Sequence, residues 1–389
     1  MTISIIITLC ILLLLAYVFD ISASKTKIPS VILLLVLGFI AKRLSEGLHF
    51  SVPNLNPVLP ILGTVGLILI VLEGSLELEI NRSKVPLIFK SSLVAIFPLL
   101  IISFGLAYYL HLVEQLPLKL ALGSAIPIGI ISSAIAIPSA RNLLNNEKDF
   151  ITYESSLSDI FGVILFNFIT LNDNIGTQTF GRFVLELLIM LAISFIATIL
   201  LAGLLNKIKH HIKFVPIIIL VLLIYGLSKL FHLPALIFIL LFGLFIGNID
   251  ELRHLKLIQR LHPVNFNTEV HRFREITTEL AFLIRALFFI LFGYLIEMPE
   301  VLNSETIILA LCITIGIFLI RYIVLKIFKL PANPLVFIAP RGLITILLFL
   351  SIPVSQQIAQ INKSLIIQVI ILSALVMMIG LMKYQNPKN

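Results

Sequence analysis

One apolar stretch of the sequence carries two carboxylates and two hydroxyls at helical spacing. In a helix that turns about 100° per residue, its polar residues and one glycine fall within roughly 140° of one face; they are Glu154, Ser155, Ser158, Asp159 and Gly162. A carboxylate in apolar surroundings can hold a proton or a metal cation, but it does not hold both well. We therefore expect this face to bind a cation in competition with a proton. The alternative is a buried polar network without a ligand.

Other ionisable residues also stand inside apolar stretches, where they are costly and indicate function by default. They are Glu73, Lys90, Glu186, Glu279, Arg285, Arg321 and Arg341. Lys90 stands about one turn from a segment end and can reach the interface, and Glu186 and Glu279 are near enough to segment ends to be solvated. Two roles stay open for Arg285: it neutralises an acid of the site, or it pairs with Glu279.

The composition places these residues in a membrane protein. Of the 389 residues, 59% are hydrophobic and 12% charged, and the mean hydropathy is +1.12, whereas soluble domains carry roughly 25% charged residues. The net charge of +8 does not indicate nucleic-acid binding, because no basic run is interleaved with aromatic residues. The sequence shows no glycine-rich phosphate loop for a nucleotide. Cys10 and Cys312 stand in apolar runs, so we expect neither a disulfide framework nor a thiolate metal site.

Thirteen segments are long and apolar enough to cross a bilayer core of about 30 Å. They run approximately from Ile3 to Phe19, Ile28 to Ala41, Pro57 to Leu76, Pro86 to Leu110, Leu116 to Leu143, Phe150 to Leu171, Phe183 to Leu205, Phe214 to Leu230, Leu233 to Ile249, Ile276 to Ile296, Thr306 to Phe328, Pro334 to Ile352 and Leu365 to Met382. The first is expected to be a retained span rather than a signal peptide. The longest loop, about Asp250 to Glu275, is too short for a folded domain.

The loops between these segments predict the orientation of the chain. Loops after odd-numbered segments, together with the C-terminal tail, carry about three times as many Lys and Arg residues as loops after even-numbered segments. Basic residues concentrate in cytoplasmic loops. We therefore expect the N-terminus outside and the C-terminus in the cytoplasm, and we assign most of the net positive charge to orientation.

Two of the segments are interrupted in corresponding places of the two halves. The fifth contains Pro127, Ser132, Ser133 and Pro138, and the twelfth contains Pro340 followed by Arg341 and Gly342. Paired broken helices in the repeats of a transporter place free helix ends and unwound backbone at a midplane ion site. A single proline kink would be weak evidence, because kinks are common in membrane helices.

Five groups of residues resemble the monovalent cation:proton antiporters, the sodium/proton exchanger superfamily, and in particular its electroneutral branch. Residues 154–159, Glu-Ser-Ser-Leu-Ser-Asp, are similar to the family's Glu-Ser-Leu-Leu-Asn-Asp signature, and residues 73–78 to its Gly-Gly-Leu-Glu-Leu stretch. Residues 288–293 are similar to the phenylalanine-rich run of the tenth helix. Arg321 matches an arginine of the eleventh helix, and Arg341 with Gly342 the Arg-Gly pair of the twelfth.

This resemblance implies an all-α integral membrane protein of the sodium/proton antiporter fold, built from two inverted repeats with crossing broken helices. The first repeat would cover about residues 1–172, a linker helix about 181–205, and the second repeat about 214–383. It also implies a homodimer in the plasma membrane. A six-helix core, made of segments four to six and eleven to thirteen, would move against a dimerisation domain in an elevator-like step.

The resemblance also implies roles for individual residues. Asp159 would be the transport carboxylate, and Glu73 would lie near the ion. Two departures affect the site: Ser132 and Ser133 stand where most relatives have Thr-Asp, and Ser158 stands where they have Asn. Hydroxyl groups remain, but one site carboxylate is lost.

The resulting hypothesis is one-for-one, electroneutral exchange of Na⁺, with K⁺ and Li⁺ as alternatives, for H⁺. Asp159 would hold either ion, with Ser155, Glu73 and the serines of the fifth segment supplying further oxygens. Glu154 would pair with Arg341 or Arg321, and neither arginine can release a transported proton. We expect no cofactor and no catalytic residue.

Three alternatives compete with this hypothesis. A K⁺ efflux or K⁺:H⁺ system of the electrogenic branch would normally bring a nucleotide-binding domain and two adjacent aspartates. A membrane enzyme would need a catalytic cluster, but all eight histidines lie in loops or near segment ends. The third alternative is a transport-inactive sensor or scaffold, since loss of a site carboxylate is also what degeneration would produce.

Overall fold

The computed structural model describes residues 2–26, 28–47, 54–79, 81, 83–172, 176–207, 213–231, 233–249 and 263–384, and within them it is helical without any strand. The elements are α1 (Thr2–Thr26), α2 (Ser30–Gly47), α3 (Val58–Glu77), α4 (Val85–Val113), α5 (Leu118–Gly129), α6 (Ser133–Ser139), α7 (Asn145–Leu171), α8 (Thr177–Lys207), α9 (Phe214–Leu230), α10 (Leu236–Gly247), α12 (Pro263–Leu295), α13 (Met298–Val301), α14 (Ser304–Ile327), η1 (Leu335–Phe337), α15 (Leu343–Ser351), η2 (Val354–Gln356) and α16 (Lys363–Lys383). The predicted all-α fold is confirmed.

Each of the thirteen predicted segments carries a helix. The fifth segment divides into α5 and α6 and the twelfth into η1 and α15, while every other segment corresponds to one helix. Within the described part of the chain, nine helical spans are long and apolar enough to cross a membrane, with α5 and α6 counted together, and α9 and α10 are shorter apolar helices. The chain is therefore a multi-span membrane protein.

The predicted loop from Asp250 to Glu275 is wrong in its second half. Helix α12 begins at Pro263, before the predicted start of its segment at Ile276. Hydropathy marks where the chain enters apolar surroundings, but backbone hydrogen bonding decides where a helix begins. Proline is tolerated at the first helical position, and the residues from 264 to 275 include neither Pro nor Gly to stop the helix. Residues 250–262 lie outside the described part of the chain.

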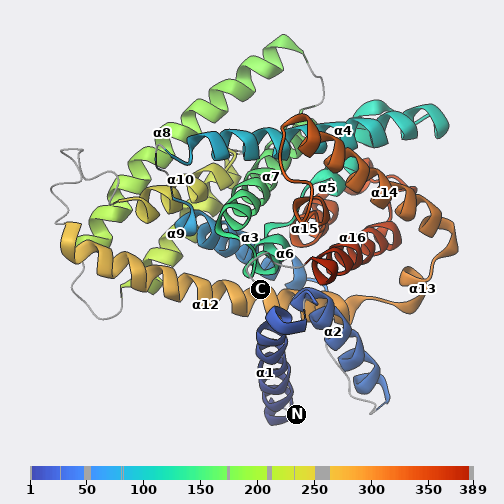
Figure 1. The fold of residues 1–389 in the computed structure, drawn as a ribbon, viewed down its shortest axis with the longest axis horizontal. Helices are drawn as coiled ribbons and strands as arrows, with labels where there is room; N and C mark the ends of the chain where they lie inside the picture. The colour runs from blue at the N-terminus through green and yellow to red at the C-terminus, as the bar shows by residue number, and fades with distance from the viewer. Residues whose placement is uncertain are drawn as a thin grey trace.

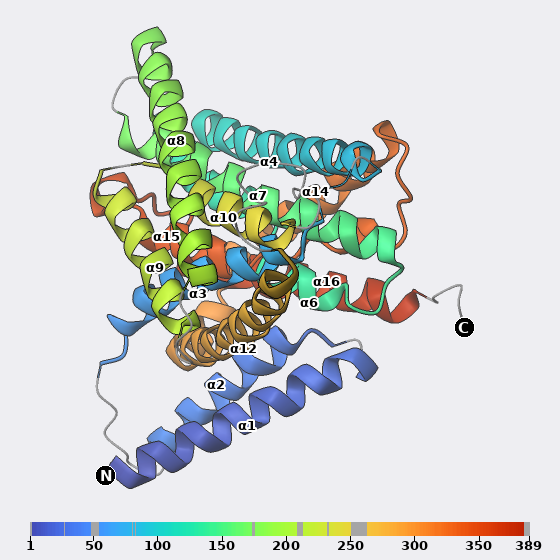
Figure 2. The same ribbon diagram turned by 90° about the vertical axis from the view of Figure 1, so that its left-hand side faces the viewer.

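The helices pack as two bodies (Figures 1 and 2). The first, which we call the core bundle, contains α4, α5, α6, α7, α14, α15 and α16. The second, which we call the scaffold, contains α1, α2, α3, α8, α9, α10 and α12, and its α12 packs against both α2 and α3. Figure 2 shows α1 and α2 at the opposite side of the molecule from α4. Helix α3 connects the two bodies, because it also contacts α6, α7 and α15.

Close backbone contact holds the scaffold together. A Cβ on Gly38 of α2 would lie 2.0 Å from the carbonyl oxygen of Ile290, and a Cβ on Gly293 of α12 would lie 2.2 Å from that of Leu35. Each glycine therefore lets the partner backbone approach where any side chain would collide. Small residues that allow such approach are typical of helix pairs in membranes.

Two ionic clusters lie at the ends of the helices. In one, the Nζ atom of Lys84 lies 2.8 Å from the carboxylates of both Glu79 and Asp149, and the Tyr153 hydroxyl donates to the Glu79 carbonyl. We call these four residues the α3–α7 latch, because they join the end of α3 to α7 of the core bundle. Burial by itself lowers the pKa of Lys84, but its hydrogen bonds to the two carboxylates outweigh burial and the net shift is upward.

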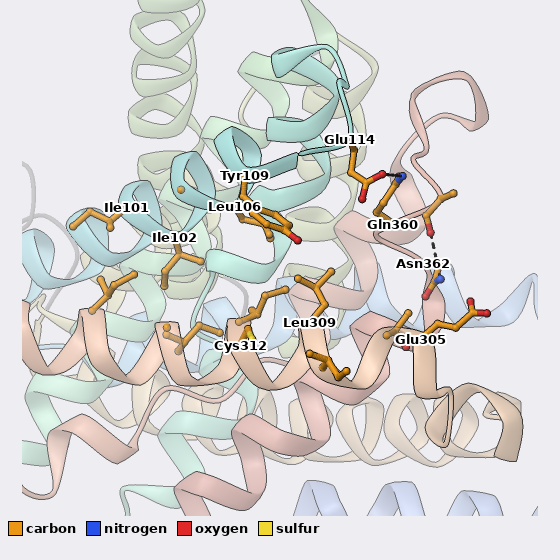
Figure 3. Close-up of a pocket in the computed structure, with 18 residues that line it drawn as sticks. Ile101, Ile102, Leu106, Tyr109, Glu114, Glu305, Leu309, Cys312, Gln360 and Asn362 are labelled. Atoms are coloured by element: carbon orange, nitrogen blue, oxygen red, sulfur yellow. Dashed lines mark hydrogen bonds between the residues drawn. The ribbon is translucent and has the colours of Figure 1, made fainter. Parts of the chain in front are cut away.

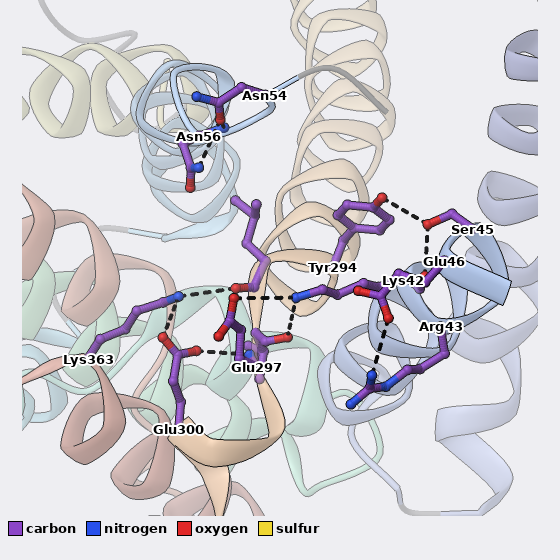
Figure 4. A network of polar contacts seen from close by, with 12 residues as sticks. Lys42, Arg43, Ser45, Glu46, Asn54, Asn56, Tyr294, Glu297, Glu300 and Lys363 are labelled. Atoms are coloured by element: carbon purple, nitrogen blue, oxygen red, sulfur yellow. Dashed lines mark hydrogen bonds and ion pairs between the residues drawn. The ribbon is translucent and has the colours of Figure 1, made fainter. Parts of the chain in front are cut away.

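The second cluster lies at the connection between α12 and α14, which contains the short helix α13 (Figure 4). Lys42 of α2 donates to the Ile296 carbonyl at 3.4 Å and lies 3.9 Å from Glu297. Lys363, the first residue of α16, contacts Glu300 at 2.8 Å and the Leu295 carbonyl at 3.1 Å. Both bodies are thus attached by lysines to the same short connection.

Candidate ion site at the crossing of two broken helices

The two interrupted segments cross in the core bundle. Helix α5 ends at Gly129, residues 130–132 are not helical, and α6 begins at Ser133. In the twelfth segment the chain leaves η1 at Phe337 and becomes helical again at Leu343. The Ser132 backbone N–H donates to the Pro340 carbonyl at 2.9 Å, so the two unwound stretches are hydrogen-bonded to each other.

Arg341 stabilises this crossing through backbone carbonyls. Its guanidinium donates to the carbonyls of Ile128 at 2.8 Å, Gly129 at 3.3 Å and Ala339 at 2.7 Å. The first two belong to the last turn of α5, whose carbonyls lack partners within the helix and carry partial negative charge. The side chain is 1% exposed. Arg341 therefore caps the broken end of α5.

Asp159 of α7 faces the start of α6. Its Oδ2 atom accepts a hydrogen bond from the Ser133 hydroxyl and one from the Ser133 backbone N–H at 3.4 Å. Its Oδ1 atom is buried and has no hydrogen-bond partner among the residues the structure describes. The residue is 1% exposed. One oxygen of a buried carboxylate is thus held by the broken helix, and the other is free to bind an ion.

The neighbouring hydroxyls have different tasks. The Ser158 hydroxyl accepts the N–H of Ile131 at 3.0 Å and so holds the unwound backbone. The Ser155 hydroxyl donates to the Ile151 carbonyl of its own helix at 2.7 Å. The Ser132 hydroxyl is buried and has no partner within the described residues. A Cβ on Gly342 would lie 2.9 Å from it, so Ser132 faces the start of α15.

Glu154 and Arg321 form a buried ion pair. Both Nη atoms of Arg321 donate to the Glu154 carboxylate, one of them at 2.8 Å, and each side chain is 1% exposed. The Arg321 Nε atom donates to the Leu335 carbonyl at 2.8 Å. Of the two arginines considered for Glu154, the structure brings Arg321 into contact and places Arg341 on the carbonyls of α5. The pair joins α7 to α14 and to η1.

Glu73 and Arg285 lie close together inside the scaffold. Arg285 Nη1 lies 3.7 Å from a Glu73 carboxylate oxygen, and the two residues are 4% and 8% exposed. The Arg285 Nη2 atom has no partner among the described residues. The structure thus places Arg285 beside Glu73 rather than Glu279, which is exposed. Glu73 precedes Gly74, whose Cβ position lies 3.1 Å from the Ser156 hydroxyl of α7.

Sequence reasoning missed two buried hydroxyls near these helices. Ser156 and Thr345 have side-chain oxygens that are buried and lack partners in the described part of the chain. Ser156 falls outside the polar arc of its helix, and Thr345 stands three residues after Gly342 in the broken segment. A hydroxyl inside an apolar helix was the available signal, but such hydroxyls commonly bond to their own helix backbone.

The donor set suits a transported monovalent ion better than a resident divalent metal. Among the described residues, no group of three His, Cys, Asp or Glu side chains could hold a metal. His111 and His271 are exposed, and the other six histidines lie outside the described residues. Cys10 and Cys312 are free and exposed. One carboxylate with hydroxyl and carbonyl oxygens is a hard, weakly charged site, which suits an ion that must also leave.

Crossed, discontinuous helices of this kind are typical of one class of protein, the secondary membrane transporters. The family model for the transmembrane sodium/hydrogen exchangers matches residues 10–382, and the chain belongs to that family. It is therefore a secondary transporter and not an enzyme, and its family moves monovalent cations and protons across membranes.

Solved structures agree with the family. The chain is similar to the sodium proton antiporter MjNhaP1 from Methanocaldococcus jannaschii at pH 8, with 17% sequence identity, a TM-score of 0.67, and 98% of this chain and 96% of that chain covered. A second structure of the same antiporter, from an electron-microscopy map, gives 18% identity and a TM-score of 0.68, with 99% of each chain covered. No curated protein sequence matches this chain. At this identity the likeness shows the fold.

Proposed function

We propose that this protein exchanges Na⁺ for H⁺, with Asp159 as the shared binding site for both ions. The observation that carries the proposal is the free Oδ1 atom of Asp159, which is buried without a partner in the described structure. Glu154 and Glu73, the other buried acids among the described residues, each face an arginine. A buried carboxylate without a fixed countercharge must bind a proton or a cation to be neutral.

Hydroxyl oxygens near Asp159 support a cation site there. Ser155 stands one helical turn before Asp159 on the same face, and Ser132 adjoins Ser133, which already bonds to Asp159. Ser158 supports the site by holding the Ile131 N–H. We assign Glu73 to the edge of the proposed cation site, because Gly74, the next residue of α3, lies against α7.

One switching charge favours electroneutral exchange. Arg321 is neutralised by Glu154, Arg285 faces Glu73, and Arg341 is bound by the carbonyls of α5. These charges stay fixed while Asp159 changes partner, so one Na⁺ would be exchanged for one H⁺. An arginine does not deprotonate at accessible pH and cannot supply a second proton.

Access to the site would alternate by movement of the core bundle against the scaffold. The division of the helices into two bodies supports this step, because the crossing lies within one body. We also propose two inverted repeats with the boundaries given above. The basic loops support an orientation with the N-terminus outside and the C-terminus in the cytoplasm, and the plasma membrane is proposed by resemblance. A homodimer is proposed by resemblance.

Transport by purified protein in liposomes tests the proposal. Na⁺, K⁺ and Li⁺ would be added in turn while a trapped dye reports internal pH, and Na⁺ is expected to drive the largest exchange. Asp159→Asn is expected to abolish the signal, because an amide can neither release a proton nor neutralise Na⁺. Glu186→Gln is the matched control, since Glu186 pairs with Arg182 at the surface of α8.

The controls separate failure of transport from failure of folding. The Asp159→Asn protein should elute as the wild type does in size-exclusion chromatography, because the side-chain oxygen of Asn can still accept the hydrogen bonds from Ser133. Normal exchange by that variant would overturn the proposal. A voltage-sensitive dye tests stoichiometry: a potential generated by exchange would contradict the one-for-one ratio.

A further inference from the structure

A groove of about 800 Å³ runs between α4 and α14 of the core bundle (Figure 3). Both helices are long and apolar enough to cross a membrane. The groove is lined by exposed Ile101 and Tyr109 on α4 and by exposed Ile308 and Cys312 on α14. Because both walls are membrane-crossing helices with exposed apolar side chains, the groove opens toward the lipid.

Two glycines widen this groove, one on each wall. No atom of the described structure lies within 4 Å of the position that a Cβ would take on Gly105 or on Gly316. These glycines therefore differ from Gly38 and Gly293, which allow close backbone contact. Glycine destabilises a helix interior relative to alanine, and here the two glycines face each other's wall across the groove and leave room in it for a chain of another molecule.

The groove is slightly longer than the hydrocarbon part of one leaflet of a bilayer. On α4 the lining runs from Ile101 to Glu114, and on α14 from Glu305 to Ile320. At 1.5 Å per residue each wall is about 20 Å long, while half of a 30 Å hydrocarbon core is about 15 Å. A single acyl chain that enters from the interface would lie along the apolar part of both walls.

Polar groups gather at one end of the groove, and the two charged ones are acidic. Figure 3 shows Glu114, Glu305, Gln360 and Asn362 together at that end, where the Gln360 amide donates to Glu114 at 2.9 Å. None of the described residues that line the groove is basic. The adjacent Lys363 is already bound to Glu300 at 2.8 Å. Two carboxylates without a cationic partner in the described structure attract a positive group and repel an anionic one.

We propose that this groove binds one phospholipid with a primary ammonium headgroup, its acyl chain between α4 and α14 and its ammonium at the acidic end of the groove, where Glu114 stands on one wall and Glu305 on the other. An ammonium donates hydrogen bonds to carboxylates, whereas a quaternary choline cannot. An anionic headgroup such as phosphatidylglycerol presents only negative charge to the two glutamates. The proposal concerns a lipid that stays with the moving core bundle and is separate from the ion site.

Native mass spectrometry of the full protein tests the proposal. The protein would be equilibrated with an equimolar mixture of phosphatidylethanolamine, phosphatidylcholine and phosphatidylglycerol and then released from detergent. We expect one retained phosphatidylethanolamine per chain, with a preference over phosphatidylglycerol of about tenfold, which is the size of one charge-assisted hydrogen bond. Equal retention of the three lipids would overturn the headgroup assignment.

Variants locate the lipid. Gly316→Phe fills the groove and should remove the retained lipid, whereas Gly226→Phe on α9 also points into open space and should leave it bound. The double variant Glu114→Gln with Glu305→Gln should keep a lipid but lose the headgroup preference. Retention of phosphatidylethanolamine by Gly316→Phe would show that the lipid lies elsewhere and overturn the proposal.

A second copy of the chain is the competing occupant, and Cys312 reports on it. In a Cys10→Ser background, oxidation of membranes should leave the protein as a monomer on denaturing gels, because lipid separates Cys312 from any neighbour. An efficient disulfide between two Cys312 residues would place a second chain over the groove and overturn the proposal. Na⁺/H⁺ exchange by the Gly316→Phe variant is measured as well. It shows whether the proposed ion site works when the groove is filled, so a failure of the lipid proposal can be told apart from a failure of the ion site.

Discussion

The scaffold and the core bundle bury helices in a bilayer in different ways. In the scaffold, α2 and α12 are continuous, and Gly38 and Gly293 let their backbones touch. In the core bundle two helices are broken, and the backbone at the break between α5 and α6 is bound by Arg341, Asp159 and Ser158. The scaffold therefore depends on shape and the core bundle on polar partners.

The same difference appears in the buried arginines of the two bodies. Arg321 in the core bundle uses both Nη atoms on Glu154 and its Nε atom on a carbonyl. Arg285 in the scaffold lies 3.7 Å from Glu73, and its Nη2 atom has no partner in the described structure. A complete set of bonds makes a fixed connection, whereas the longer contact between Arg285 and Glu73 leaves one Nη atom of the arginine without a partner in the described structure. Polar groups in a membrane stabilise the fold where they are satisfied, and those that are unsatisfied are candidates for function.

The largest expected effect comes from breaking the complete pair. Arg321→Met leaves Glu154 buried without its countercharge and should lower the free energy of unfolding by about 3–5 kcal/mol. Arg285→Met should cost clearly less, because its pair is longer and incomplete. Thermal unfolding of both variants in detergent makes the comparison.

A double variant controls for lost packing. Adding Glu154→Leu to Arg321→Met removes the uncompensated acid and should restore most of the lost stability. If the double variant is as unstable as Arg321→Met alone, the arginine acts through packing and the contrast between the two pairs fails.

The next largest effect is expected in the scaffold. Gly293→Ala places a Cβ 2.2 Å from the Leu35 carbonyl oxygen, and the two backbones must move apart at a cost of about 3 kcal/mol. Gly226→Ala on α9, where no described atom lies within 4 Å, should be neutral or slightly stabilising. Equal unfolding temperatures for the two variants would contradict the close packing of α2 and α12.

A smaller effect separates the serines of the ion site. Ser158→Ala leaves the Ile131 N–H without its partner and should cost about 1–2 kcal/mol, with a raised Na⁺ concentration for half-maximal exchange because the unwound backbone loosens. Ser155→Ala removes a proposed cation oxygen but, within the fold, only a bond to its own helix, and it should change stability by less than about 0.5 kcal/mol. A larger stability loss for Ser155→Ala would reverse these assignments.

The smallest effect is expected at the α3–α7 latch. Lys84→Gln breaks two partly exposed ion pairs and should lower the free energy of unfolding by less than about 1 kcal/mol. Folding raises the pKa of Lys84. The ion pairs of Lys84 therefore contribute their full stability at any pH below the ordinary pKa of lysine, and they lose it only as the pH rises above that pKa. The difference between wild type and variant should therefore be constant through neutral and moderately alkaline pH. A difference that disappears there would contradict the assignment.

Much of the fold could be predicted because its signals are local. Each predicted segment carries a helix, and the prolines and small residues at 127–140 and 338–342 marked both breaks. The start of α12 could not be found in this way, since its first turns are polar and lie before the apolar run. Asp159, Ser133 and Arg341 could be named from their types, but their partners could not.

The sequence by itself determined that the chain lies in a bilayer, where its helices run and which charges stand inside them. It could do so because hydropathy, periodicity and proline act over a few residues. The tertiary structure decided which charges meet. Glu154 lies 167 residues from Arg321, and no local pattern distinguishes that arginine from Arg341. The structure also decided that Asp159 keeps one oxygen free, since a carboxylate is paired or unpaired only through groups that folding brings from distant helices.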